Sequence, residues 1–399
     1  MKEDLRVLVI APFYDSFPFV GDLIDATSKY VEHIDVLIHH NYLAELAPYI
    51  PLPYFRWVER FTKKNLVGLK PKPKNVKVHM LSTLYFTPDG RNRGLGDKLY
   101  KKFSRYIREH NLEFDIIHAH VHWPQGYVAV KLGKEFGVPA VVTVHTSQIY
   151  LEDFCDPNKQ EYEHMHFVFR SADALIRVNQ AGISLLKRFN PNVYYVPNGF
   201  NPQRLPFIPK EKAREKLGLP KNKRIIFSLG RLIERKGFRY LIDAMGEVIK
   251  RRNDVLCFIG GTGELKSKLQ TQIHNLGIQN YVKLLGFVPD EELKYWMNAA
   301  DFFVLPSLSE GNPTVLFEAL GVGLPFVGTA VGGVPEVITS KEYGLLCPPK
   351  DPKCLAEKIL MALEKEWDRE KIRKYAEQFT WDNITKKTVE IYKEVLGYE

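Results

Sequence analysis

The sequence predicts an α/β protein made of two doubly wound domains, each a parallel sheet with helices on both faces. Short apolar runs rich in β-branched residues alternate with helical patterns along most of the 399 residues, as in sheets whose strands are joined by helices. That length exceeds one typical core. A stretch with four prolines, a glycine and two asparagines, residues 196–210, separates two such series and reads as a linker.

The first series precedes this linker. Its predicted strands are the apolar runs at residues 5–10, 34–38, 76–81, 115–119, 140–144, 174–178 and 193–196. Its predicted helices lie near residues 20–31, 97–110, 125–136, 160–171 and 180–189. We therefore expect an N-terminal domain over residues 1–198.

The second series follows the linker. Its predicted strands are at residues 224–229, 255–260, 282–285, 302–305 and 326–328. Its predicted helices lie near residues 237–252, 263–275, 289–298, 313–321 and 352–365. We expect a C-terminal domain over residues 199–378, followed by an amphipathic helix within 379–399. Ligands bind beyond the carboxyl ends of strands in such sheets, so two facing domains predict a cleft between them.

The composition is that of an ordinary water-soluble protein, with 45% hydrophobic and 26% charged residues. No run of about 18 apolar residues occurs, and no small-residue cleavage site follows the first apolar run. We therefore expect neither a transmembrane helix nor a signal peptide. The four cysteines are widely spread without a CxxC spacing, which favours a reduced cytoplasmic location and disfavours structural zinc.

The net charge of +9 is concentrated in residues 56–77, where eight basic residues meet one acidic residue, Glu59. Aromatic and aliphatic residues such as Phe55, Trp57 and Phe61 are interleaved with these charges. Two interpretations remain open: a segment that docks on an anionic membrane surface, or a solvated loop whose aromatic residues face the core. Nucleic acid is a third, weaker interpretation of the charge, but no recognised nucleic-acid-binding motif accompanies it, so a nucleic-acid partner is not expected.

A first candidate site lies between a predicted strand that ends at Gly230 and a helix that begins near Gly237. The loop between them carries Arg231 and Lys236. A helix N-terminus favours an anion, and two cations beside it suit a phosphate or pyrophosphate. The alternative is that both cations are simply solvated. A second glycine-rich loop, residues 260–263, follows the next strand and suggests close backbone approach to a ligand.

A third candidate site is the stretch SEGNPTVLFEALGVGLP, residues 309–325, in which Glu310 and Glu318 lie eight positions apart. We expect Asn312 to be the N-cap of a helix and Pro313 its first residue. Glu310 would then lie in the preceding loop and Glu318 inside the helix. They could hold two parts of one extended ligand, form a glycosidase pair, serve as metal ligands, or be surface acids of a capped helix.

Histidines mark the N-terminal half. His145 follows the predicted strand 140–144, and His118, His120 and His122 have the alternate spacing that places side chains on one face of a strand. Such spacing would suit a metal site, but no carboxylate pattern accompanies the trio and no metal is expected. A satisfied structural role is the alternative for each of these histidines.

Taken together, these motifs resemble the family 4 retaining glycosyltransferases with the GT-B fold. The resemblance is carried by GRL…KG, GGTGEL, LGFVP, SLSEGNPTVLFEALGVGLP and TAVGGVPEVI, and it is strongest in residues 196–338. The E-x7-E element formed by Glu310 and Glu318 matches the family signature in order and spacing. The chain departs from the family near its N-terminus, where Gly21 stands in place of a Gly-Gly loop, and at Asn201, where an Asp is common.

The resemblance implies roles for these residues. Arg231 and Lys236 would bind the donor pyrophosphate, Glu318 the ribose and Glu310 the donor sugar. Other donor-binding positions would be Gly230, Gly261, Phe287, Gly311, Asn312, Pro313 and Thr314. On the acceptor side the resemblance implies Gly21, His120 and a His145 that faces the reacting sugar. Gly332, Gly333 and Glu336 are expected to be mainly structural, and the resemblance implies that the C-terminal helix, residues 379–399, packs back on the N-terminal domain.

The implied function is retaining transfer of a hexosyl unit from a nucleotide-sugar to a hydroxyl of a glycan or lipid-linked acceptor. No metal cofactor is expected, since the chain has no DxD motif. The cysteine pattern predicts a cytoplasmic enzyme, and the basic segment adds peripheral contact with the inner face of the membrane as a further expectation. The alternatives are a sugar phosphorylase, a sugar-nucleotide epimerase, and a non-catalytic nucleotide-sugar-binding protein.

Overall fold

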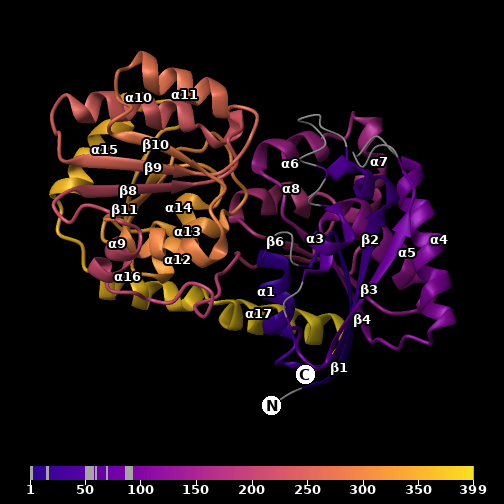
Figure 1. Cartoon of the computed structure of the whole chain (residues 1–399). Helices are drawn as coiled ribbons and strands as arrows, with labels where there is room; N and C mark the ends of the chain where they lie inside the picture. Colours follow the sequence, from indigo (N-terminus) through magenta and orange to yellow (C-terminus); the bar gives the residue numbers. More distant parts are fainter. Residues whose placement is uncertain are drawn as a thin grey trace. The chain divides into compact units, whose positions relative to one another are not determined.

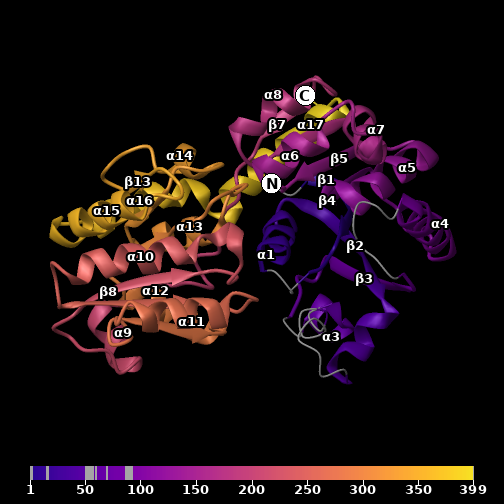
Figure 2. The same ribbon diagram turned by 90° about the horizontal axis from the view of Figure 1, so that it is seen from above.

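The computed structural model describes residues 3–14, 18–49, 58, 61–68, 71–85 and 93–398. The chain forms two compact units (Figures 1 and 2). The first comprises Met1–Pro197 together with Trp381–Glu399, and the second comprises Asn198–Thr380. Each unit is a parallel sheet with helices on both faces, which confirms the predicted α/β fold class.

The first unit contains a seven-stranded sheet of order β3-β2-β1-β4-β5-β6-β7, in which all described pairings are parallel. Its strands are β1 (Glu3–Ala11), β2 (Val31–Asn41), β3 (Val76–Thr83), β4 (Ile116–His120), β5 (Ala140–Val144), β6 (Ala174–Arg177) and β7 (Val193–Tyr195). The chain winds in one direction from β1 to β3 and then in the other from β4 to β7. The order therefore reverses between β1 and β4, as doubly wound sheets require.

Helices cover both faces of this sheet because alternate strand residues point to opposite sides. Leu8 and Ile10 pack with helices α4, α5 and α7, whereas Val7 and Val9 pack with α1 and α17. These helices are α1 (Pro18–Thr27), α4 (Arg93–Glu109), α5 (Tyr127–Phe136), α7 (Glu163–Ser171) and α17 (Trp381–Leu396). The short helices α3 (Lys63–Val67), α6 (Gln148–Phe154) and α8 (Ile183–Lys187) lie in the connections.

The second unit contains a six-stranded parallel sheet of order β10-β9-β8-β11-β12-β13. Its strands are β8 (Arg224–Leu229), β9 (Val255–Gly260), β10 (Val282–Gly286), β11 (Phe302–Leu305), β12 (Phe326–Thr329) and β13 (Gly344–Cys347). Strand β13 was not predicted, because GLLC is a four-residue run with too little pattern to distinguish it from a loop. It pairs in parallel with β12 and so completes the sheet edge.

Helices also cover both faces of the second sheet. Phe227 and Phe303 pack with α12, α13 and α16, whereas Ile226 and Val304 pack with α10, α11 and α15. The helices are α9 (Lys210–Lys216), α10 (Phe238–Ile249), α11 (Lys266–Asn275), α12 (Asp290–Ala299), α13 (Thr314–Gly321), α14 (Val334–Val337), α15 (Pro352–Glu364) and α16 (Arg369–Ala376). Strands buried on both faces explain why these segments read as continuous apolar runs.

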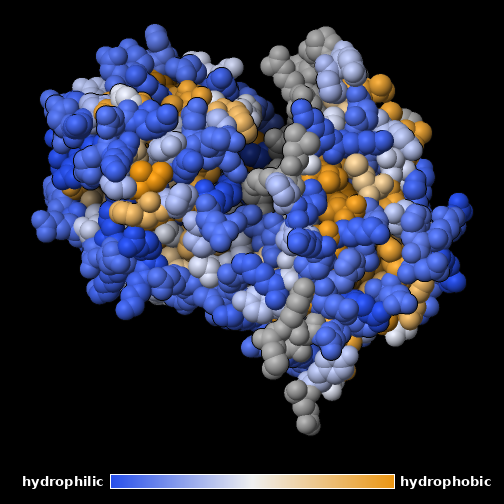
Figure 3. Space-filling view, turned by 60° about the horizontal axis from the view of Figure 1, so that its bottom comes forward, coloured by the Kyte–Doolittle hydropathy of each residue, from blue (hydrophilic) through white to orange (hydrophobic). Residues whose placement is uncertain are grey.

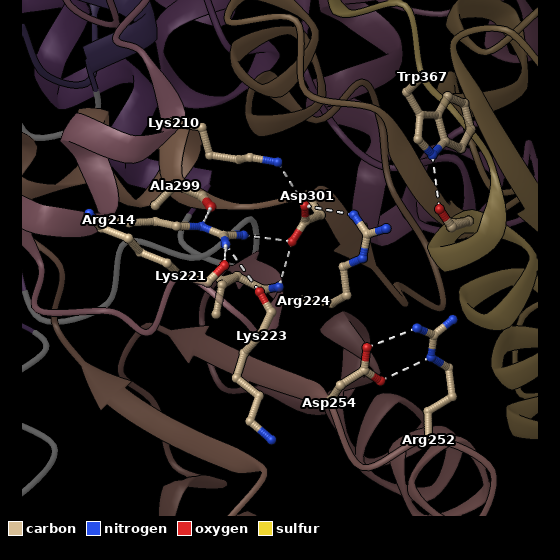
Figure 4. A network of polar contacts seen from close by, with 12 residues as sticks. Lys210, Arg214, Lys221, Lys223, Arg224, Arg252, Asp254, Ala299, Asp301 and Trp367 are labelled. Carbon is tan, nitrogen blue, oxygen red and sulfur yellow. Dashed lines mark hydrogen bonds and ion pairs between the residues drawn. The ribbon is translucent and has the colours of Figure 1, made fainter.

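A carboxylate just before β11 fastens the first helix of the second unit to its sheet (Figure 4). Asp301 accepts hydrogen bonds from Lys210 Nζ at 3.1 Å and Arg214 Nη2 at 2.8 Å, both on α9, and from the Ile225 backbone N–H at 2.7 Å. Burial alone would raise the pKa of Asp301, but these donors outweigh burial and hold the pKa below its ordinary value. This network of ion pairs and hydrogen bonds therefore connects α9 and β8 to the residue that precedes β11.

The surface is mostly hydrophilic on the face shown in Figure 3, where hydrophobic residues form separate patches. Exposed large hydrophobic residues include Tyr42, Leu46 and Tyr49 on the 3-10 helix Tyr42–Tyr49. Within the described part of the chain, no helix has the length and apolar character needed to cross a membrane.

Candidate functional site

The strand order of the second unit reverses between β8 and β11, and two loops leave the sheet at that point. Residues 230–237 follow β8, and residues 306–313 follow β11. Because both strands are parallel, both loops emerge at the same carboxyl edge. This is the topological switch point at which doubly wound sheets bind ligands, and it carries Arg231, Lys236 and Glu310.

The two loops are held close together by backbone contacts. Gly237 has a left-handed φ of +65°, and a Cβ atom there would lie 2.1 Å from the carbonyl oxygen of Pro306. The backbone N–H of Leu308 donates to the carbonyl of Arg235 at 2.8 Å. Only glycine fits this position without strain, since it tolerates both the φ value and the close approach. The Lys-Gly dipeptide therefore brings Lys236 to the neighbouring loop.

Glu310 is the centre of the polar contacts between these loops. The residue is only 4% exposed, and its side chain accepts hydrogen bonds from Lys236 Nζ at 2.6 Å and Ser307 Oγ at 2.6 Å. Arg235 Nη1 donates to the second carboxylate oxygen at 3.0 Å. Burial alone would raise the pKa of Glu310, but the adjacent cations and hydrogen bonds outweigh burial and lower it. Glu310 is thus an ionised, fixed carboxylate.

Arg235 was not singled out from the sequence, although it directly precedes Lys236. It donates to the Ser309 carbonyl at 2.6 Å as well as to Glu310, so it braces the backbone that carries Glu310. The signal was available as a third cation in the same loop. Arg231, by contrast, has an exposed side chain at the beginning of that loop.

Glycines in the loop after β9 allow another close approach. A Cβ atom at Gly261, whose φ is +135°, would lie 1.8 Å from the carbonyl oxygen of Gly230. A Cβ atom at Gly263 would lie 2.3 Å from the carbonyl oxygen of Leu232. The sequence suggested that these glycines admit a ligand. These close contacts are between the loops that follow β8 and β9, and approach of a ligand to the same glycines stays a prediction.

Glu318 lies on α13 and is paired with an arginine that the sequence did not reveal. Arg204 Nη1 donates to Glu318 Oε1 at 2.6 Å, while its Nε and Nη2 donate to Asp290 at 2.8 and 3.0 Å. Burial alone would lower the pKa of Arg204, but the two carboxylates outweigh burial and raise it. Arg204 belongs to the linker, 114 positions from Glu318, so no local pattern linked the two.

The predicted helix cap at Asn312 was wrong. Helix α13 begins at Thr314, and Pro313 is its N-cap residue, with extended φ and ψ angles and no side-chain cap. Asn312 Oδ1 instead accepts from the backbone N–H of Asn198 at 2.8 Å, and Asn198 Nδ2 donates to the Asn312 carbonyl at 2.6 Å. These buried backbone groups need partners, and the reciprocal amide pair satisfies them. The pair ties the PNG segment to the loop before α13.

The glycine pair after β12 supports the same loop. A Cβ atom at Gly332, whose φ is +53°, would lie 2.1 Å from the carbonyl oxygen of Glu310. The backbone N–H of Gly333 donates to the Gly311 carbonyl at 2.8 Å. Both contacts are with backbone that carries Glu310, in keeping with a structural contribution. Phe287, in the loop after β10, differs from these packed residues because it is 76% exposed.

The first unit also gathers polar side chains at the carboxyl edge of its sheet. His118 and His120 are buried on β4, and His145 follows β5. His120 Nδ1 lies 3.4 Å from His145 Nε2. Burial lowers the pKa of His120 to about 4 and also lowers the pKa of His118 and His145, so these rings are neutral at pH 7.

His122 does not share a strand face with His118 and His120 as predicted. Strand β4 ends at His120, and Val121 has a φ of +85°, so the chain turns before His122. His122 packs between Phe154 and Phe169, with ring centroids 5.3 and 5.7 Å away. Among the residues with described positions, no group of three or more His, Cys, Asp or Glu side chains could hold a metal ion.

Gly21 lies on α1 and packs against the segment that follows β1. A Cβ atom at this position would lie 2.5 Å from the carbonyl oxygen of Tyr14. The glycine is therefore required for the close approach of α1 to that segment.

In the basic segment, residues 56–77, Leu66 is buried and Phe61 is partly buried against the core, while Lys63 and Lys64 are exposed. Phe55, Trp57 and Arg56 lie outside the described residues.

Comparisons with known families cover most of the chain. Residues 66–204 match the family described as Glycosyltransferase Family 4, and residues 209–379 match the family described as Glycosyl transferases group 1. An uncharacterized glycosyltransferase of Methanocaldococcus jannaschii is 30% identical over 70% of this chain and 75% of its own length. A D-inositol 3-phosphate glycosyltransferase of Corynebacterium urealyticum is 30% identical over 72% and 73%, respectively.

Solved structures show the same architecture. The sucrose-phosphate synthase of Thermosynechococcus elongatus has a TM-score of 0.77, with 20% identity over 98% of this chain and 99% of its own. HepE of Anabaena in complex with UDP-glucose has a TM-score of 0.71, with 21% identity over 98% and 100%. With two family matches and relatives at 30% identity over most of both chains, this chain belongs to the family 4 glycosyltransferases and is an enzyme with the GT-B fold.

Proposed function

We propose that this glycosyltransferase moves a hexosyl unit from a nucleotide-sugar to an acceptor hydroxyl with retention of configuration. The observation that carries the proposal is the arrangement at the β8/β11 switch point. There, Glu310 is ionised and held by Lys236 and Arg235, and Glu318 is held separately by Arg204. Separate cationic partners suit two carboxylates that hold two parts of one extended ligand.

The donor pyrophosphate would lie by the loop after β8. Lys236 and Arg231 provide cations there, and the N-termini of α10 and α13 add backbone N–H groups. Such fixed positive groups stabilise the charge that develops on a departing nucleoside diphosphate. They are the reason we expect transfer to proceed without a metal cofactor.

Glu318 would accept hydrogen bonds from the ribose hydroxyls, with Arg204 fixing the carboxylate. Glu310 would contact the donor sugar, together with the backbone of residues 311–314. Asn312 Nδ2 is buried without a hydrogen-bond partner among the described residues, so it is a candidate donor for the same ligand. Phe287 would border the base, for which an exposed aromatic ring is suited.

The acceptor would be bound by the first unit, through Gly21, His120 and His145. The second unit would bind the donor. In the front-face route, the acceptor oxygen bonds to the anomeric carbon on the side from which the phosphate departs. The anomeric carbon–oxygen bond to phosphate breaks, and the leaving phosphate takes the acceptor proton. Retention follows because bond formation and cleavage share one face.

Relatives support the proposed donor class and a hydroxyl-bearing acceptor. HepE of Anabaena was solved with UDP and with UDP-glucose, and one relative is a D-inositol 3-phosphate glycosyltransferase. We therefore propose a UDP-sugar as the first donor to test, and a glycan or lipid-linked hydroxyl compound as acceptor.

The basic segment adds a proposal about location. Lys63 and Lys64 are exposed on α3, whereas Leu66 of the same helix is buried, so the cations face solvent and the apolar side faces the core. We propose a cytoplasmic enzyme that contacts the anionic inner face of a membrane through this segment. In liposome flotation it would bind anionic but not neutral vesicles, and Lys63→Glu/Lys64→Glu would bind less. Equal failure with both kinds of vesicle would reject this proposal.

The decisive experiment is a thermal-shift screen against UDP-, GDP- and ADP-sugars, with EDTA present. A ligand at about 100 times its Kd stabilises the fold by about 2.7 kcal/mol. One responding donor whose effect is lost in Glu318→Ala would support the donor site and metal-independent binding. Stabilisation by inorganic phosphate alone, with phosphate-dependent turnover, would favour a phosphorylase. No response to any sugar nucleotide would count against the proposed donor site.

A further inference from the structure

A continuous line of polar side chains joins the C-terminal helix of the first unit to the end of β5. Tyr392, on α17, has its hydroxyl 2.5 Å from His118 Nδ1. The other ring nitrogen of His118, Nε2, lies 2.7 Å from Thr143 Oγ1. The His118 ring contacts the His120 ring, with centroids 4.3 Å apart, and His120 Nδ1 lies 3.4 Å from His145 Nε2.

The inner members of this line are buried, and their polar atoms are engaged with one another and with Thr143. Tyr392 and His118 are 1% and 2% exposed, respectively. Two hydroxyl groups bracket the His118 ring, so it cannot rotate without losing a hydrogen bond to Tyr392 or Thr143. The ring is therefore a fixed surface against which His120 packs, and any influence on chemistry has to pass through His120 and His145.

The hydrogen bond between His120 and His145 couples the tautomers of the two rings. In a hydrogen bond between two neutral imidazoles, one nitrogen donates and the other accepts. Whichever tautomer His120 adopts therefore selects the tautomer of His145. Burial lowers the pKa of all three histidines and raises the pKa of Tyr392, so the line is uncharged and acts through orientation alone.

We propose that Tyr392 is a positioning residue for His145. Its hydroxyl fixes His118, His118 fixes His120, and His120 holds the ring of His145 in one orientation and one tautomer. The proposal rests on the role proposed above for His145 in the transfer reaction. Helix α17 begins at Trp381, directly after the last residue of the second unit, Thr380. Docking of this helix on the first unit would then be a condition for an ordered His145.

The test compares Tyr392→Phe with a matched control, Tyr194→Phe. Tyr194 also donates its hydroxyl to α17, to Glu394 Oε1 at 2.6 Å, but it does not touch the histidine line. Nitrogen-15 NMR of the histidine rings, recorded without substrate, reports their tautomers. We expect shifted or doubled His120 and His145 signals in Tyr392→Phe and wild-type signals in Tyr194→Phe. We also expect kcat to fall about tenfold in Tyr392→Phe, with the donor KM unchanged.

A second variant covers the case in which Tyr392→Phe does not fold. Thr143→Val keeps the side-chain shape and removes the other partner of His118, so it should disturb the same signals. Wild-type histidine spectra in the folded variants would overturn the proposal, as would disturbed spectra with unchanged kcat. Full activity in His145→Ala would instead overturn the role of His145 in the reaction, while the spectra would still test the link from Tyr392.

Discussion

The two sheets of this molecule present chemically opposite groups at equivalent edges. At the switch point of the second unit, between β8 and β11, the side chains are ionised and paired: Glu310 with Lys236 and Arg235. At the carboxyl ends of β4, which pairs with β1 at the switch point of the first unit, and of β5, they are neutral rings: His120 beside His145. The same edge of the same fold is thus equipped in one case for charge and in the other for hydrogen bonding. The fold fixes where a site lies, and the side chains decide its chemistry.

Removing a cation from the charged edge is expected to have the largest effect. Lys236→Ala should lower kcat/KM by about 10²- to 10³-fold, because a fixed charge that stabilises the leaving group is lost. Glu310 keeps Arg235 and Ser307, so the protein should remain folded. Steady-state kinetics with a responding donor would measure this loss.

The control for that prediction is Lys250→Ala. Lys250 is an exposed residue just after α10 and pairs only at the surface, with Glu247, so its removal should leave kcat/KM unchanged. Equal kcat/KM of Lys236→Ala and Lys250→Ala would contradict a catalytic contribution of charge at the edge formed by β8 and β11.

The second largest effect is expected at Arg204. Arg204→Met keeps much of the side-chain volume but leaves Glu318 and Asp290 without their shared cation. Donor binding should weaken about 30-fold, equivalent to about 2 kcal/mol, and calorimetry would measure the change in Kd. Arg252→Met is the matched control, because it removes a two-bond arginine–aspartate pair near the surface of the same unit. If both variants bound donor like the wild type, Glu318 would not depend on Arg204.

Lowering the pH should destabilise the first unit before it destabilises the second. The folded pKa of His120 is about 4 against 6.5 ordinarily, so between these values the folded protein binds fewer protons than the unfolded one. The stability of the first unit should therefore fall as pH drops from about 6.5 towards 4, by up to ~1 kcal/mol per pH unit for this residue.

The carboxylates Glu310 and Asp301 of the second unit respond to acid in the same direction as His120, but at lower pH. Their folded pKa values are lowered, so their contribution is intact above about pH 4 and is lost only as pH falls further. Hydrogen exchange at pH 7.0 and 5.5 should therefore show earlier loosening around β4 and β5 than around β8 and β11. His120→Gln should reduce that difference, and uniform loosening of both sheets would contradict the contrast.

The smallest effect is expected at Phe287. Because this side chain is 76% exposed, Phe287→Ala should leave the melting temperature unchanged. Loss of a ring that borders the base should weaken donor binding several-fold, about 1 kcal/mol. A titration that gave the wild-type Kd would remove Phe287 from the donor site without affecting the assignments of Lys236 or Glu318.

The sequence predicted most of the fold because strands buried on both faces appear as uninterrupted apolar runs. It missed β13, whose four residues carry too little pattern, and α9, a mostly charged helix that Asp301 anchors from a distant part of the chain. The sequence also identified two residues of the candidate site, Lys236 and Glu310, because each lies in a local motif.

What could not be predicted is which side chains meet. Arg204 is 114 positions from Glu318, so their ion pair exists only after folding. Asn312 is of a residue type favoured as a helix N-cap, yet its side chain accepts a hydrogen bond from Asn198, far away in the sequence. His122 has strand spacing, but the backbone turns at Val121 before reaching it. In each case a long-range or backbone constraint overrode a valid local preference.

The placement of α17 has a consequence for how this protein is made. Trp381, Ile384 and Tyr392 belong to the apolar core of the first unit, whose residues outside Trp381–Glu399 all precede position 198. During synthesis, that core stays incomplete until α17 has left the ribosome, long after its sheet has been translated, whereas the second unit is fully translated earlier. A nascent chain halted at Thr380 would therefore present an uncovered apolar face, and the unit translated first would be the last to finish folding.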